Sequence, residues 1–223
     1  MERSQKNTPS YALYLMCHGD SRRDDVKRYI GQTHLPLNEK GIEQAKYWQQ
    51  KLSSICFCRI YCSDLVRSLE TARIVAQNRR ISIRTLPELR EIHLGAWEGL
   101  SVAEVHQRFP GEYERRGEDF SDYRPPSGES FSDLQRRVLP VFERIVSDTQ
   151  GNVLIVGHAG VNRTILCHVL GMPLDNLFRL EQQPGSLSII ARKGSSFRLR
   201  AVNILPATQK SRYPYNIIRS RMG

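Results

Sequence analysis

Two histidines far apart in the sequence each follow a short apolar run that predicts a buried strand. His18 comes directly after YALYLMC, and His158 comes directly after NVLIVG. Ligands of α/β proteins bind where loops leave the carboxyl ends of such strands. A neutral imidazole can attack phosphorus, and a second, charged histidine can stabilise the charge on the phosphoryl oxygens. One such histidine would be a weak signal, but the repeated arrangement indicates a site for phosphate chemistry.

An arginine and two carboxylates could complete this chemistry. Arg67 follows a strand and a Ser-Asp turn and lies in the first turn of the next expected helix. A guanidinium there can bind a phosphate with two hydrogen bonds beside the helix N-terminus. Cleavage of a phosphate ester also needs a proton for the departing oxygen, which an enclosed carboxylic acid can give. Glu91 and Glu98, in the segment LREIHLGAWEG, are the candidates, and their positions alone do not choose between them.

The elements that must position these residues follow from the alternation of β-prone apolar runs with helical patterns, which favours a sheet with crossover helices. Capping-box spacing at Ser101 and Ser130 marks the starts of two helices. The last two strands, joined by Lys-Gly-Ser-Ser, predict a hairpin. The expected strands are Ala12–Cys17, Arg59–Cys62, Ile81–Leu86, Val153–Gly157, Ser186–Ala191 and Phe197–Asn203. The expected helices are Glu39–Leu52, Leu65–Gln77, Val102–Phe109, Phe131–Asp148 and Val161–Leu170.

Length and composition indicate one globular domain. The chain has 223 residues, of which 39% are hydrophobic and 25% charged, as expected for a soluble protein. No apolar run approaches the ~18 residues of a membrane span, and the polar N-terminus lacks the apolar stretch of a secretory signal. The five cysteines are an odd number and favour a reducing, cytoplasmic setting. Cys56 and Cys58 have no second Cys or His pair at zinc spacing, so we expect no metal.

Positive charge is concentrated near the C-terminus. The segment 182–223 holds eight cations and no Asp or Glu, so it carries eight of the net charge of +10. Such a segment is typical of a solvated basic tail, and it could also attract an anionic ligand. Nucleic-acid binding is not expected, because the segment contains no recognisable binding motif. We therefore expect a flexible N-terminus over 1–10, a domain over 11–205 and a basic tail over 206–223.

A long excursion is expected between Pro110 and Gly128, where the composition turns to Gly, Pro, Glu and Arg. Long loops in compact domains often cover a site. Arg115, Arg116 and Arg124 could there contact an additional anionic group of a substrate.

These segments resemble those of the histidine phosphatase superfamily, also called the phosphoglycerate mutase-like family. Its hallmark is a strand that ends in Arg-His-Gly, here Cys17-His18-Gly19. The similarity runs in order through roughly residues 11–205. The matching segments are Gly31-Gln32-Thr33, Pro36–Gly41 with Gln44-Ala45, Ser63–Ala72, Leu89–Gly99, Gly128-Glu129-Ser130 and Val156–Arg163.

The resemblance implies a single three-layer α/β domain with a mostly parallel sheet, and cofactor-independent hydrolysis of a phosphomonoester. By that resemblance, His18 becomes phosphorylated, Glu91 is the proton donor, and Arg67 and His158 hold the phosphoryl group. Phosphate contacts are also expected at the positions Gly19, Ala159 and Cys17. The compact insert resembles the phosphatase branch, including alpha-ribazole phosphatases, rather than the mutases. By the same resemblance, Glu98 is expected to have a structural role. The expected partner is a small anionic phosphorylated substrate. No membrane association is expected, and the protein could form a homodimer.

Cys17 departs from the family pattern, because a cysteine cannot replace a phosphate-binding arginine. Loss of one charged hydrogen bond costs a few kcal/mol, or roughly two to three decades in rate. Arg22 or Arg23 could reach back and compensate. Otherwise the protein is a weakened enzyme or a phosphate-binding relic with a regulatory role. A third possibility is that Cys17 is an engineered or spontaneous substitution.

Cys17 also begins a Cys-x5-Arg pattern that ends at Arg23, as in cysteine-dependent phosphatases, in which a thiolate attacks phosphorus. Asp24 stands where those loops carry Ser or Thr. That match rests on two residues, so a thiolate nucleophile is the weaker alternative. Phosphoglycerate mutase activity is also a weaker alternative.

Overall fold

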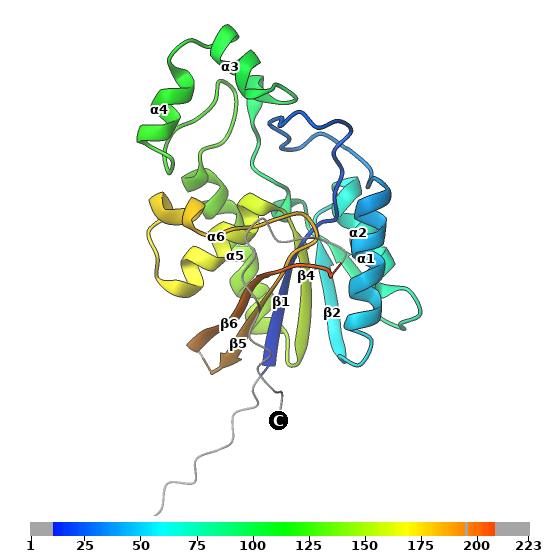
Figure 1. The fold of residues 1–223 in the computed structure, drawn as a ribbon. Helices are drawn as coiled ribbons and strands as arrows, with labels where there is room; N and C mark the ends of the chain where they lie inside the picture. The colour runs from blue at the N-terminus through cyan, green and yellow to red at the C-terminus, as the bar shows by residue number, and fades with distance from the viewer. Residues whose placement is uncertain (1–10, 195, 208–223) are drawn as a thin grey trace, which may run out of the picture.

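The computed structural model describes residues 11–194 and 196–207, and the expected segment 1–10 and most of the expected basic tail lie outside them. One six-stranded sheet, in the order β3-β2-β4-β1-β5-β6, forms the centre of the fold (Figure 1). Its strands are β1 (Tyr11–Cys17), β2 (Phe57–Cys62), β3 (Ile83–Thr85), β4 (Asn152–Gly157), β5 (Leu187–Lys193) and β6 (Ser196–Ile204).

The sheet is mostly parallel, as expected. β1 pairs in parallel with β4, and β2 pairs in parallel with β4 and β3. β5 runs antiparallel to β1 and to β6, which confirms the terminal hairpin. The expected strand 81–86 is shorter, because only Ile83–Thr85 pair with β2. β1 and β4 therefore lie side by side and end together, with Cys17 opposite Gly157.

Helices cover both faces of the sheet. Figure 1 shows α1 and α2 on one side and α5 and α6 on the other. Both predicted capping boxes form, at Ser101 with Glu104 and at Ser130 with Asp133. No helix in the described ranges is long and apolar enough to cross a bilayer. The helices are α1 (Glu39–Lys51), α2 (Val66–Ala76), α3 (Val102–Arg108), α4 (Glu112–Glu118), α5 (Phe131–Asp148) and α6 (Ala159–Leu170).

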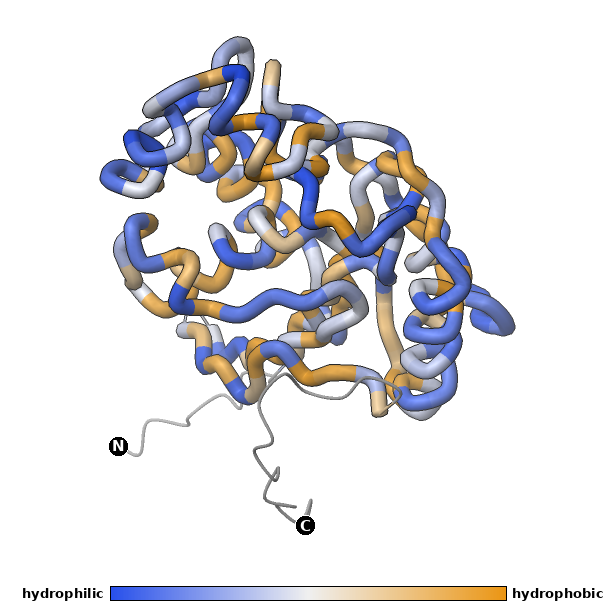
Figure 2. Tube along the Cα trace, turned by 45° about the horizontal axis from the view of Figure 1, so that its top comes forward, coloured by the Kyte–Doolittle hydropathy of each residue, from blue (hydrophilic) through white to orange (hydrophobic). Residues whose placement is uncertain are grey.

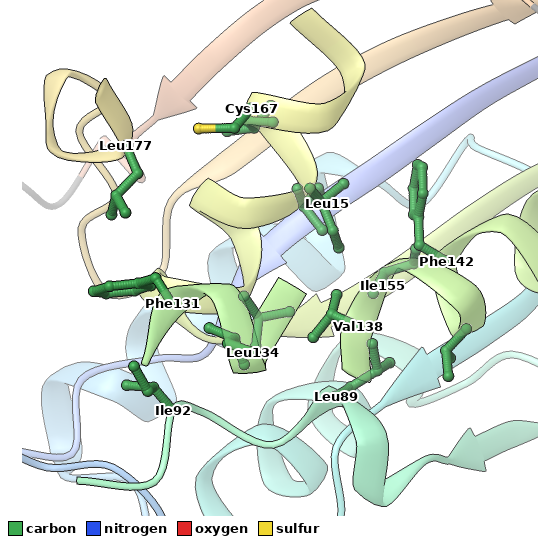
Figure 3. Close-up of a cluster of buried hydrophobic side chains, with 14 of the residues drawn as sticks. Leu15, Leu89, Ile92, Phe131, Leu134, Val138, Phe142, Ile155, Cys167 and Leu177 are labelled. Atoms are coloured by element: carbon green, nitrogen blue, oxygen red, sulfur yellow. The ribbon is translucent and has the colours of Figure 1, made fainter. Parts of the chain in front are cut away.

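The strands alternate their side chains between two apolar clusters, as the period of two demands. In β1, Leu13 and Leu15 join the cluster beneath α5 and α6, part of which Figure 3 shows. Met16 joins the cluster beneath α1 and α2. Cys17 continues the series of Leu13 and Leu15, so its side chain lies on the α5 and α6 side. This direction decides which groups can reach it.

The segment between Pro110 and Gly128 contains a helix that the sequence did not predict. α4 buries none of its residues, so it has no apolar stripe to reveal it. Figure 2 shows mostly hydrophilic tube in this region, and Figure 1 shows α3 and α4 above the carboxyl ends of β1 and β4. Gly111, the N-cap of α4, has a φ of 80°, a conformation that glycine adopts without strain.

Helix α6 also begins earlier than predicted. The expected start was Val161. Instead His158 is the N-cap and Ala159 is the first helical residue. The Gly160 N–H is satisfied by the Glu91 side chain, at 3.0 Å from Oε2, which is how a helix end supplies its free N–H groups to a partner. The second histidine is thereby fixed at the N-terminus of α6.

Candidate active site

The first histidine is fixed by the strands beneath it. The His18 N–H donates to the Gly157 carbonyl across β1 and β4, at 3.0 Å. Its Nδ1 lies 2.7 Å from the Gly19 carbonyl. A carbonyl can only accept, so Nδ1 carries the proton in this bond and the lone pair is on Nε2. His18 thus presents Nε2 as its nucleophilic atom.

Gly19 lies behind His18 in close contact with α1. A Cβ at Gly19 would lie 2.5 Å from the Gly41 carbonyl oxygen, so only glycine fits. The Gly19 N–H donates to Thr71 Oγ1 at 3.0 Å. Because this amide is already bonded, Gly19 supports the His18 ring rather than facing the cleft.

Arg67 is buried beside the first histidine, with 1% of its surface exposed. Its Nε donates to His18 Nε2 at 3.1 Å. Its two terminal nitrogens donate to the carbonyls of Thr33 and Gly31, at 2.8 and 2.6 Å. Burial lowers the Arg67 pKa from its usual value, but an arginine remains charged at neutral pH. The site therefore contains a fixed positive charge.

Glu98 contacts the loop that holds this guanidinium. Its carboxylate accepts hydrogen bonds from the backbone N–H groups of Gly31 and Thr33, at 2.9 and 3.1 Å, and from the Thr33 hydroxyl at 2.7 Å. The carbonyls of the same two residues bind Arg67. Glu98 thus fixes the loop geometry, which agrees with the structural role expected for it.

His158 lies against the first histidine, with ring centroids 5.0 Å apart, and is fully buried. Its Nε2 lies 2.7 Å from Ser63 Oγ, and its buried Nδ1 has no partner within the described chain. If the Ser63 hydroxyl donates to Nε2, Nδ1 carries a proton that is free for a ligand. Sequence reasoning assigned no role to Ser63, although it stands in the matching segment 63–72.

Glu91 closes another side of the site. It is 8% exposed, and its oxygens accept the N–H groups of Ile92 and Gly160, at 2.9 and 3.0 Å. Glu91 lines the same cleft as His18 and Arg67, whereas Glu98 does not. The structure therefore distinguishes the two carboxylates that sequence position left equal.

Burial keeps both histidines neutral. It lowers the pKa of His18 to about 3, and the Arg67 charge adds to the shift. Burial, followed by the Arg67 charge, holds the pKa of His158 well below its usual value, so His158 is neutral, whereas a charged histidine was expected from the sequence. An imidazolium has no free lone pair on either nitrogen, so this neutral state is the one that a nucleophile requires.

The Cys17 thiol lies in the cleft wall and is 1% exposed. Burial raises its pKa to about 12, and Glu91 adds to the rise. The thiol is therefore protonated at neutral pH and is a poor nucleophile. This environment disfavours the cysteine-dependent alternative.

The arginines expected to compensate for Cys17 differ in their contacts. Arg22 lines the cleft, but its Nε lies 3.0 and 3.1 Å from the two oxygens of Asp20. Arg23 also lines the cleft and is exposed. A third cation was missed by sequence reasoning. Arg163, one turn into α6, is the largest of the charges that oppose the rise in the Cys17 pKa. The side-chain direction along β1, which points position 17 toward α6, was the signal available for it.

A cleft of about 480 Å³ is lined by six of these residues: Cys17, His18, Arg22, Arg23, Arg67 and Glu91. Ala159 lines it at the start of α6, where free helical N–H groups favour an anion. Among residues 11–194 and 196–207, no cluster of three or more His, Cys, Asp or Glu could hold a metal ion. Two neutral histidines, a buried arginine and an enclosed carboxyl group define a site of the phosphoryl-transfer class.

Comparison with known proteins agrees with this class. Residues 13–205 match the histidine phosphatase superfamily, branch 1. The adenosylcobalamin/alpha-ribazole phosphatase of Salmonella typhimurium is 34% identical over 180 residues, which are 80% of this chain and 89% of that protein.

Solved structures show the same relationship. The alpha-ribazole phosphatase of Shigella flexneri superposes with a TM-score of 0.80 at 30% identity, over 86% of this chain and 96% of that one. A mycobacterial glucosyl-3-phosphoglycerate phosphatase gives 0.79 at 26% identity, over 87% and 99%. The chain therefore belongs to the histidine phosphatase superfamily. The predictions of this family, its fold and a histidine-dependent phosphatase are confirmed.

Proposed function

We propose that the protein hydrolyses a phosphomonoester of a small metabolite in two steps through phospho-His18. One observation carries the proposal. Burial keeps the His18 imidazole neutral, and its Nε2 lone pair is directed at the Arg67 guanidinium. The relatives named above are phosphatases whose names refer to alpha-ribazole and glucosyl-3-phosphoglycerate. An alpha-ribazole phosphate-like compound or a sugar phosphate is the substrate class that these likenesses support.

Substrate binding must first release the nucleophile. In the free site Arg67 Nε donates to the same nitrogen that attacks. A phosphate oxygen is a stronger acceptor than a neutral imidazole, so it takes over this hydrogen bond and frees the Nε2 lone pair. The unpartnered Nδ1–H of His158 donates to a second phosphate oxygen.

The first step forms a bond between His18 Nε2 and phosphorus and breaks the bond from phosphorus to the alcohol oxygen. The Glu91 carboxyl group gives a proton to that oxygen. In the second step a water attacks phosphorus and gives its proton to the Glu91 carboxylate. The bond from nitrogen to phosphorus breaks, inorganic phosphate leaves, and both side chains return to their starting forms.

Cys17 lowers the rate in this scheme, because no guanidinium occupies its position. Arg22 is hydrogen-bonded to Asp20, which leaves Arg163 and Arg23 as the candidate sources of compensating charge. The second candidate function, a phosphate-binding protein with little turnover, rests on the same substitution.

The test is hydrolysis of p-nitrophenyl phosphate by the wild type, Cys17→Arg and His18→Ala. We expect turnover in the wild type, loss of it in His18→Ala, and a gain of about two decades in Cys17→Arg. Turnover only in Cys17→Arg would establish the binding protein. Turnover that survives His18→Ala but not Cys17→Ala would establish thiolate chemistry.

We propose that the protein is cytoplasmic. All five cysteines are free in the structure, and a reducing compartment keeps thiols in that state.

A further inference from the structure

A second cavity, which shares no lining residue with the active-site cleft, lies on the β5 and β6 hairpin. Its volume is about 360 Å³. Among the described residues, no Asp or Glu lines it, but four cations do, namely Arg192, Lys193, Arg198 and Arg200. They are four of the eight cations in the basic segment 182–223, for which the proposed function has no use. We call this cavity the hairpin pocket.

The hairpin pocket and the active site lie at opposite ends of the sheet. Arg192 pairs with Tyr11, the first residue of β1, whereas His18 follows the last residue of that strand. β1 has seven residues, which span about 20 Å of extended chain. Figure 1 shows the turn between β5 and β6 at the end of the sheet away from α3 and α4. A ligand of the hairpin pocket therefore does not occupy the place of the substrate.

Three of the four cations project from one face of the hairpin. Ser196, Arg198 and Arg200 share a face because side chains alternate along a strand with a period of two. Lys193 pairs with Ser196 and Ala191 pairs with Arg198, which puts both on that face as well. Arg198 and Arg200 are about 7 Å apart along β6. The short Ala191 side chain, among these longer ones, leaves room for a ligand.

None of the four charges has a carboxylate partner in the part of the chain that the structure describes. The three that share a face are exposed to solvent, so a ligand can reach them. Arg192 donates to the carbonyls of Gly194 and Val146, which fix its guanidinium but carry no net charge. Like charges gathered in one pocket repel each other. An anion with several charges would bind these cations together and remove the repulsion.

The size and charge of the hairpin pocket indicate the chemistry of its ligand. About 360 Å³ falls within the range of small-molecule sites, about 300–1,000 Å³, so the hollow favours a small molecule over the flat surface of a macromolecule. A guanidinium binds a phosphate with two parallel hydrogen bonds. A terminal phosphate carries up to about two negative charges, against one on a carboxylate. A short chain of phosphates therefore matches four cations in the smallest volume.

We propose that the hairpin pocket binds a small anion that contains a chain of phosphate groups, at a site separate from the catalytic centre. The inference goes beyond the proposed function and does not depend on it. Inorganic tripolyphosphate and the triphosphate of a nucleotide share this chemistry, and the experiment distinguishes the two sources. The pocket residues take no part in the hydrolysis at His18.

The test is calorimetric titration of the full chain with inorganic tripolyphosphate, ATP and orthophosphate at low ionic strength. We expect tripolyphosphate to bind at least about tenfold more tightly than orthophosphate, the effect of one additional charged hydrogen bond. ATP that binds as tightly as tripolyphosphate, or more tightly, would assign the pocket to a nucleotide. Weaker binding of ATP would assign it to the free anion. Equal binding of tripolyphosphate and orthophosphate would overturn the proposal.

Two matched double variants locate the binding. Arg198→Gln/Arg200→Gln removes two charges from the hairpin pocket, and Arg80→Gln/Arg84→Gln removes two exposed charges at β3, on the other side of the sheet. We expect the affinity for tripolyphosphate to fall at least about tenfold in the first variant and to stay within about twofold in the second. Both variants change the net charge equally, so equal losses would show only a general attraction to a basic chain and would overturn the proposal. Unchanged binding in Arg198→Gln/Arg200→Gln would place the anion elsewhere and overturn it as well.

An acidic protein segment is the alternative occupant, and a short oligoglutamate peptide serves as its probe. We expect this peptide to bind more weakly than tripolyphosphate. Tighter binding of the peptide that Arg198→Gln/Arg200→Gln removes would overturn the assignment to phosphate. These titrations measure binding without turnover, so they remain decisive if no phosphoester is hydrolysed and the proposed function fails.

Discussion

Replacing Gly160 with alanine places a methyl group where the Glu91 carboxyl lies. A Cβ at this position would stand 2.4 Å from Glu91 Oε1, 3.2 Å from its Cδ and 3.3 Å from Phe131 Cε1. Favourable contacts between heavy atoms begin at about 3.5 Å, so the carboxyl must retreat by about 1 Å. The backbone of Gly160 is helical, and alanine is the best helix former. The variant therefore disturbs the acid without breaking α6.

The size of the effect depends on the leaving group. A displacement of ~1 Å in a reacting group can lower the rate about 10²-fold. An alkyl alcohol needs its proton, so Gly160→Ala should lower kcat/KM on an alkyl phosphate by about 10²-fold. The p-nitrophenolate ion leaves without full protonation, so the loss on its ester should stay within about tenfold.

Steady-state kinetics on the two esters measure this difference. Gly117→Ala is the matched control, since a Cβ at this exposed glycine of α4 meets no atom within 4 Å. It should leave both rates unchanged. Equal losses on the alkyl and aryl esters in Gly160→Ala would refute Glu91 as the proton donor.

Two further predictions concern Arg67 and the neutral histidines. Glu98→Gln should loosen the Gly31 and Thr33 carbonyls that hold Arg67 and weaken inhibition by inorganic phosphate about tenfold; an unchanged inhibition constant would contradict this. The folded pKa of His158 lies below its unfolded value of about 6.5, so the unfolded chain binds the extra proton. Its contribution to the free energy of unfolding is complete above about pH 6.5 and falls by up to about 1.4 kcal/mol per pH unit below it. Urea unfolding at pH 7.5 and 5.5 should show a smaller decrease in His158→Gln, and equal decreases would exclude the effect.

The fold could be predicted from the sequence because its signals are local. Both capping boxes formed where the Ser-x-x-acid spacing placed them, and α5 has the predicted bounds, Phe131–Asp148. These elements combine a strong apolar pattern with a polar cap, so local and tertiary preferences agree. α4 was missed because a helix that buries nothing leaves no periodic pattern.

The site was only partly predictable, because its contacts are long-range. Spacing and resemblance gave His18, Arg67, Glu91 and His158, but no local pattern shows that Arg22 binds Asp20. Nor does it show that Arg115 and Arg124 pair with carboxylates, whereas Arg116 has no carboxylate partner within the described residues. Which ion pairs form depends on the three-dimensional distances between side chains, and these cannot be read from the order of residues in the sequence.

The central place of β1 also determines when the active site can form. This first strand pairs with β4 and β5, which come from the last third of the chain. His18 is therefore held only after loops of more than a hundred residues have closed, a topology that folds slowly. A nascent chain that stops before Leu187 leaves β1 with an open edge beside its nucleophile. During synthesis this edge is the segment most prone to pair with another chain, and completion of the β5 and β6 hairpin removes that hazard.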